Sequence, residues 1–118
     1  MILTTEERND ALDNIFDKYN SGTLKFHSAA HAVLATTTFG ATAFASAAAG
    51  QKVANAITKD SSVSAGTIDH AHVIESDTTE GAQLTCGTTG ADINLTTLTL
   101  NAAEELSITS LTMTLPAS

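Results

Sequence analysis

The last third of the chain restricts the fold more than any other part, because apolar and polar residues alternate along most of it. Between residues 91 and 116, Thr, Ser and Asn separate the large apolar residues, which are Ile93, Leu95, Leu98, Leu100, Leu106, Ile108, Leu111, Met113 and Leu115. Alternation of this kind places the apolar side chains on a buried face of a β-strand and the polar side chains on the other face. The pattern slips between Leu95 and Leu98 and again between Ile108 and Leu111. A slip of one residue exchanges the two faces, so each slip predicts a β-bulge, a bend or a strand that changes its partner.

An α-helix is predicted near the N-terminus, over about residues 5–20. Thr4 and Glu7 have the spacing of a capping box, in which each residue satisfies a backbone amide of the other. Apolar residues then recur at helical spacing on one face, namely Ala11, Leu12, Ile15, Phe16 and Tyr19. Asn20-Ser21-Gly22 is a typical helix end. We expect this apolar face to pack onto a sheet.

Further short segments with alternating patterns predict the remaining strands. They are Thr23–His27, Leu34–Phe39, Gln51–Thr58, Thr67–Glu75 and Ala82–Cys86. Polar connections are predicted at Lys59–Gly66, Ser76–Gly81 and Asn101–Glu105. Many short strands with regular turns and no alternation of strands with helices favour one class of fold. We predict one mainly β domain over residues 1–118, an antiparallel β-sandwich with one N-terminal α-helix.

The charge of the chain excludes several kinds of partner. A formal net charge of −8 and a pI near 4.6 argue against binding to nucleic acid, which needs a basic surface. The five Lys and Arg residues are scattered, so we expect no membrane-surface binding either. Phe26 to Gln51 lacks charged residues, but it has too few large apolar side chains to cross a bilayer. The start of the chain does not resemble a secretory signal, so we expect synthesis in the cytoplasm.

Four histidines raise the question of a metal site. His70 and His72 lie two residues apart, so they would share one face of a strand, and His27 or His31 could supply a third ligand. The sequence gives no reason for His27 to lie near the other strand. We therefore expect these histidines to be ordinary surface or core residues, and we predict no metal ligands and no cofactor.

The candidate motifs for catalysis and covalent chemistry do not match the sequences that such sites require. Ala45–Val53 superficially resembles a phosphate-binding loop, but it lacks the first glycine and has Val53 where Ser or Thr would contact magnesium. No serine lies in a nucleophile-elbow sequence. Cys86 is the single cysteine, which excludes an intramolecular disulfide, and we expect it to be packed and unreactive. Asn94-Leu95-Thr96 matches a glycosylation acceptor, to which we assign no role without a secretory signal. We predict no catalytic residues and no enzymatic activity.

Several segments resemble a group of small virion structural proteins of tailed bacteriophages. The resemblance is carried by Leu34–Phe39, Ala43–Ala47, Val53–Thr58, Ser76-Asp77, Gly90–Leu95 and Ser107–Thr112. Those proteins share the layout of an N-terminal helix, a first strand and then short strands that end in a Thr-rich pair. The chain departs from them at Ala29–Val33, where others carry a longer loop with Pro and Gly. It also departs at His70-Ala71-His72, where an aromatic residue is common.

The resemblance implies a structural part of a virion, with no catalytic residues to carry over. Small size and acidity suit a capsid decoration (cement) protein, which would bind the major capsid protein lattice on the capsid exterior and stabilise it. Because the interior is poor in large side chains, we also expect a homo-oligomer, a trimer or a dimer. The alternative is a tail- or fibre-associated structural or host-recognition module. A sugar-binding version would need aromatic platforms, yet Trp is absent and Tyr19 is the one tyrosine.

Overall fold

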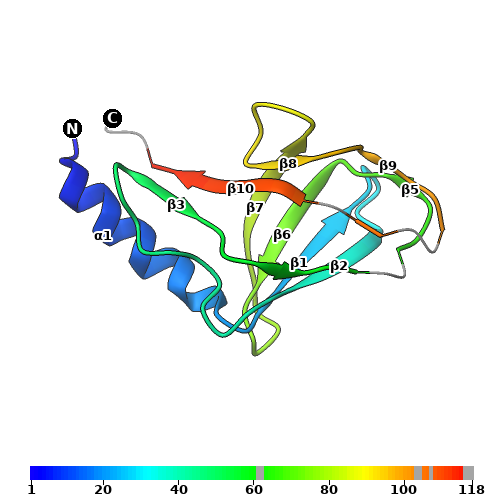
Figure 1. The fold of residues 1–118 in the computed structure, drawn as a ribbon, viewed down its shortest axis with the longest axis horizontal. Coiled ribbons are helices and arrows are strands. Elements are labelled where there is room, and N and C mark those ends of the chain that lie inside the picture. The colour runs from blue at the N-terminus through cyan, green and yellow to red at the C-terminus, as the bar shows by residue number, and fades with distance from the viewer. Residues whose placement is uncertain (61–62, 103–104, 107, 116–118) are drawn as a thin grey trace.

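A computed structural model describes residues 1–60, 63–102, 105–106 and 108–115, and it confirms a mainly β fold with one N-terminal helix (Figure 1). The described elements are, in chain order, α1 (Thr5–Phe16), the 3-10 helix η1 (Asp17–Tyr19), β1 (Thr23–His27), β2 (Val33–Phe39), β3 (Gln51–Val53), β4 (Ile57–Thr58), β5 (Gly66–Thr67), β6 (His70–Ile74), β7 (Glu80–Gly87), β8 (Ile93–Leu95), β9 (Thr99–Leu100) and β10 (Ile108–Thr114).

Most of these strands join one curled sheet in the order β3-β10-β8-β7-β6-β1-β2-β4, while β5 pairs with β9 separately. Neighbouring strands are antiparallel except β7 and β8, which pair in parallel where Cys86 lies opposite Ile93. Figure 1 shows β3 and β10 running across the direction of β6 and β7. The curl brings side chains from distant strands into one core, so that Phe26 of β1 and Leu111 of β10 belong to the same buried cluster. The sandwich is therefore made largely by one sheet that folds over itself.

The helix begins as predicted, with the Thr4 side chain and the Glu7 side chain each accepting a hydrogen bond from the backbone amide of the other residue. Leu12, Phe16 and Tyr19 are buried. The prediction was wrong for Ile15, which is 42% exposed. Residues four and three apart form a narrow stripe at Leu12, Phe16 and Tyr19, and Ile15 lies at the margin of that stripe.

The described residues of the Thr-rich last third fold as their alternation predicted. Its buried apolar residues are Ile93, Leu95, Leu100, Leu106, Leu111 and Met113. The first slip is a change of partner, because β8 belongs to the large sheet whereas β9 pairs with β5. The second slip is a bulge, because the register of β10 against β8 shifts between Ile108 and Ser110.

Two predicted strands are in fact pairs of strands. Gln51–Thr58 divides into β3 and β4, which form opposite edges of the large sheet. The chain leaves β3 because the Asn55 amide donates to the carbonyl of Ala43 at 2.9 Å and its side-chain Nδ2 donates to the carbonyl of Thr42 at 3.0 Å. Thr67–Glu75 likewise divides into β5 and β6, whose partners differ. The connections predicted at residues 59–66 and 101–105 include positions outside the described residues.

A buried lysine, which sequence analysis did not identify, joins the helix to the sheet. The side chain of Lys52 on β3 is 1% exposed, and its Nζ contacts Asp13 Oδ1 and lies 3.0 Å from Asp17 Oδ1. Burial alone would lower the pKa of Lys52, but the hydrogen bonds to the two carboxylates outweigh it and raise that pKa above its usual value. The hydrogen bond from Lys52 in turn holds the pKa of Asp13 below its usual value. Asp13 Oδ1 also accepts a hydrogen bond from the Ala47 amide at 2.9 Å, and Asn9 Oδ1 accepts one from the Gly50 amide at 2.9 Å. Side chains of the helix thus provide hydrogen-bond acceptors for backbone amides of the loop before β3.

No helix among the described residues is long and apolar enough to cross a membrane.

Candidate metal centre

Strand pairing brings His27 and His70 together. β1 and β6 are antiparallel, with His27 directly opposite His70 and Phe26 opposite Ala71. Phe26 and Ala71 are fully buried in the core. Because successive side chains point to opposite faces of a sheet, His27, His70 and His72 lie on the other face, away from the core. The two-residue spacing noted in the sequence therefore does place His70 and His72 on one face.

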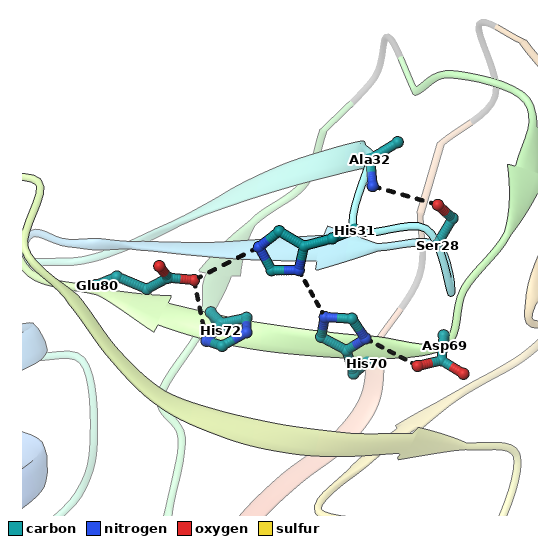
Figure 2. A network of polar contacts seen from close by, with 7 residues as sticks. All are labelled: Ser28, His31, Ala32, Asp69, His70, His72 and Glu80. Atoms are coloured by element: carbon teal, nitrogen blue, oxygen red, sulfur yellow. Dashed lines mark hydrogen bonds and ion pairs between the residues drawn. The ribbon is translucent and has the colours of Figure 1, made fainter.

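The β1–β2 loop, residues 28–32, brings His31 over the same face. The Ser28 amide donates to the Ala32 carbonyl at 3.0 Å. Ser28 Oγ accepts from the Ala32 amide at 3.3 Å, as Figure 2 shows. His31 has a φ of +64°, which is uncommon outside glycine and reflects the tight turn of the loop. Its ring stacks on that of His27, with centroids 4.1 Å apart and planes 4° from parallel. Covered in this way, His27 is only 4% exposed.

Glu80, the first residue of β7, completes the cluster. Its Oε1 lies 3.1 Å from His72 Nδ1 and 4.0 Å from His31 Nε2 (Figure 2). One donor atom from each of His27, His31, His72 and Glu80 lies within 4.8 Å of the others. Three imidazole nitrogens and one carboxylate oxygen are the donor types that zinc and similar transition metals prefer.

Two imidazoles in the cluster carry buried nitrogens that make no hydrogen bond to any residue that the structure describes. Both ring nitrogens of His27 lack a hydrogen-bond partner among the described residues. His72 Nδ1 is also buried, and its contact with Glu80 is close but lacks the alignment of a hydrogen bond. Burial is the main reason that the pKa of His27 lies below its usual value, and the nearby His31 lowers that pKa further. His27 is therefore neutral near pH 7, the form in which imidazole has a lone pair for a metal.

His70 lies beside the cluster as part of a polar chain. His31 Nδ1 is 3.1 Å from His70 Nε2, and His70 Nδ1 is 2.8 Å from Asp69 Oδ2 (Figure 2). In the tautomer in which His70 Nδ1–H donates to the Asp69 carboxylate, His70 Nε2 accepts from His31 Nδ1–H. The same tautomer places the lone pair of His31 on Nε2, the atom 4.0 Å from Glu80 Oε1.

Sequence reasoning named all four histidines but gave no reason for His27 and His31 to meet the other two. The register of β1 against β6 and the fold of the 28–32 loop bring them together. Glu80 falls in the predicted connection Ser76–Gly81, where no sequence pattern marks it as a metal ligand. The one signal in the sequence is its place in that connection, after which the next strand returns the chain toward His72.

Cys86 lies outside this cluster. It contributes to a cleft of about 390 Å³ that also contains Asp69 and His70. Burial, together with the carboxylates of Asp69 and Asp92, raises the pKa of the Cys86 thiol to about 12. The thiol is thus protonated at neutral pH and is a poor nucleophile, in keeping with the sequence-based expectation.

Comparisons with known proteins found no match to this chain among family models, curated proteins or solved structures.

Proposed function

We propose that this chain is a non-enzymatic structural protein of a phage virion, and that it binds the outside of the capsid lattice as a decoration protein. The observation that carries the proposal is the resemblance between its strand segments and small virion proteins of tailed bacteriophages. Several of those segments coincide with strands of the sheet: Leu34–Phe39 lies within β2, Gly90–Leu95 contains β8, and Ser107–Thr112 overlaps β10, whereas Ala43–Ala47 and Ser76-Asp77 lie between strands. A resemblance in the strands that build the sheet is evidence about the whole domain. A resemblance confined to surface loops would be weaker evidence, because loops vary more among related proteins.

Features of the surface support a role in assembly. The edge strand β4 has two residues, and a sheet edge offers unpaired backbone groups to a partner. The outer edge of β3 is instead covered by residues 45–48, because the backbone of Ala48 bonds that of Gln51 and the Ala45 amide donates to the Val53 carbonyl. Val53 on β3 and Val33 on β2 are each 48% exposed, which provides apolar contact area at or beside these edges. The net charge of −8 favours a partner surface with basic groups.

Capsid binding tests the proposal directly. Purified protein is mixed with empty capsids and sedimented at low and high salt, with an unrelated acidic protein of similar size as the control for non-specific charge binding. We expect saturable binding that weakens as salt rises, because exposed charges are screened within about 8–10 Å at physiological ionic strength. Absence of binding at every salt concentration would contradict the proposal.

The stabilising role needs a second measurement. Particles with and without the protein are compared in a thermal DNA-release assay, and we expect release at a higher temperature when the protein is present. Equal release temperatures, with mass spectrometry finding the protein only in detached tails, would instead favour the tail- or fibre-associated alternative.

A further inference from the structure

We propose that His27, His31, His72 and Glu80 bind one divalent transition-metal ion, with zinc as the best match, and that the ion joins the β1–β2 loop to β6 and β7. The inference concerns the isolated chain and is independent of the proposed role on a capsid.

The spacing of the donor atoms is close to that of a metal site. Zinc binds imidazole nitrogen at about 2.0–2.1 Å, so tetrahedral ligand atoms lie about 3.4 Å apart. The four donor atoms here lie within 4.8 Å of one another. The Glu80 side chain is 51% exposed and can turn toward the histidines, while the contact with His70 holds His31 and strand pairing with β1 and β7 holds His72. Closing the donor spacing from 4.8 Å to about 3.4 Å requires side-chain adjustment, and Glu80 is the least constrained of the four donors.

The buried nitrogens give an independent reason for a ligand. A buried polar atom without a partner destabilises a fold, and native proteins satisfy nearly all such atoms. His27 is more than nine-tenths buried, with both ring nitrogens unpaired among the described residues, and it adjoins the other donors. His72 Nδ1 is likewise buried and faces the Glu80 carboxylate without a hydrogen bond. A metal ion between them would satisfy a nitrogen of His27 and Nδ1 of His72 together.

The chain from His31 through His70 to Asp69 matches the surroundings of metal-bound histidines. Such histidines usually donate the second ring N–H to a carboxylate, a carbonyl or a water, which fixes the tautomer and orients the ring. Here His31 presents Nε2 to Glu80, and its Nδ1 lies 3.1 Å from His70, which in turn contacts Asp69 at 2.8 Å. We assign His70 and Asp69 to positioning His31. Because three of the four donors are nitrogens, calcium and magnesium, which prefer oxygen ligands, are poor candidates.

Cobalt and zinc titrations of the metal-stripped full-length chain test the site. Bound Co²⁺ in a tetrahedral site with nitrogen ligands gives visible d–d absorption, and zinc then competes for the same site. We expect one ion per chain, and we expect zinc to raise the melting temperature with concentration, since a ligand specific for the folded state stabilises it. Hydrogen exchange should show stronger protection of residues 28–32 with zinc, because the ion anchors that loop.

Variants separate this site from adventitious binding. His31→Asn suits the left-handed backbone at that position, and Glu80→Gln keeps the shape of a half-exposed side chain, so both should fold. We expect each to weaken zinc binding by at least about tenfold, since even residues that only support metal ligands contribute 10–100-fold. Glu6→Gln, an exposed carboxylate change on α1, is the matched control and should bind as the parent does. Failure of the parent to bind Co²⁺ or zinc stoichiometrically, or equal affinity in His31→Asn, Glu80→Gln and the parent, would overturn the proposal.

Discussion

The buried ion pair between helix and sheet allows a quantitative prediction. Asp13→Asn keeps an oxygen to accept the Ala47 amide but removes the negative charge opposite Lys52. Breaking one partner of a fully buried pair costs about 3–5 kcal/mol, because it leaves an uncompensated charge. Two observations reduce this figure: Asp17 Oδ1 remains 3.0 Å from Nζ, and the Asp13 side chain is 38% exposed, so solvent screens it. We expect Asp13→Asn to lower the free energy of unfolding by about 1–2 kcal/mol.

The same reasoning ranks the related variants. Asp17 is 56% exposed, so Asp17→Asn should cost less than about 1 kcal/mol. Combining Asp13→Asn with Asp17→Asn leaves Lys52 buried and unpaired, so the cost should exceed the sum of the single changes and approach about 3–5 kcal/mol. Lys52→Met removes the buried charge and leaves two solvated carboxylates, so it should stay within about 1 kcal/mol of the parent.

Urea unfolding followed by circular dichroism measures these differences, with thermal melting as a check. For a domain of this size, 1 kcal/mol corresponds to roughly 4 °C in melting temperature. Additive costs for the two aspartate changes would refute the reasoning. So would a Lys52→Met variant that is as unstable as the double variant, because the loss would then come from the pair itself and not from an unpaired charge.

The pH dependence of stability follows from the directions of the two pKa shifts. The pKa of Asp13 in the folded state lies below its usual value of 3.8, so its contribution is present above that value and is lost as pH falls through the lowered pKa. The pKa of Lys52 is raised above 10.5, so its contribution is present below that value and is lost only as pH rises through the raised pKa. The parent should therefore lose stability below about pH 4 more steeply than Asp13→Asn does, and equal slopes would contradict this assignment.

Three further predictions concern two aspects of packing and the reactivity of the Cys86 thiol. Leu12→Ala and Phe16→Ala remove buried side chains and should each cost about 2–5 kcal/mol in urea unfolding; melting like the parent would show that the helix stripe is not core. Gly22→Ala would place a Cβ 2.1 Å from a backbone carbonyl oxygen and should cost about 3 kcal/mol, whereas the control Gly40→Ala meets open space and should be neutral within about 0.5 kcal/mol. The Cys86 thiol should resist iodoacetamide at neutral pH in the folded state and react after unfolding in urea; fast labelling of the native protein would contradict its raised pKa.

Local pattern was sufficient to predict much of the architecture. The capping box at Thr4 and Glu7, the helix stripe and the alternation of the last third each depend on neighbours in sequence, and all three appear in the structure. Even the slip near Ile108 was visible, because a bulge shifts the alternation of side chains along a single strand. The division of Gln51–Thr58 was not visible, because it depends on hydrogen bonds between Asn55 and a distant segment.

The candidate metal centre and the buried lysine were decided by tertiary structure. The spacing of His70 and His72 already indicated a shared face, but the register of β1 against β6 selects which residue lies opposite them, and one residue of slip would turn His27 into the core. Likewise, nothing in the neighbourhood of Lys52 in sequence indicates burial; the carboxylates that make burial tolerable belong to a helix about forty residues earlier. The sequence by itself therefore determined the elements and their buried faces, because these follow from local periodicity. Only the tertiary structure decided which polar groups meet, because contacts between distant segments follow from strand order, register and the path of the loops.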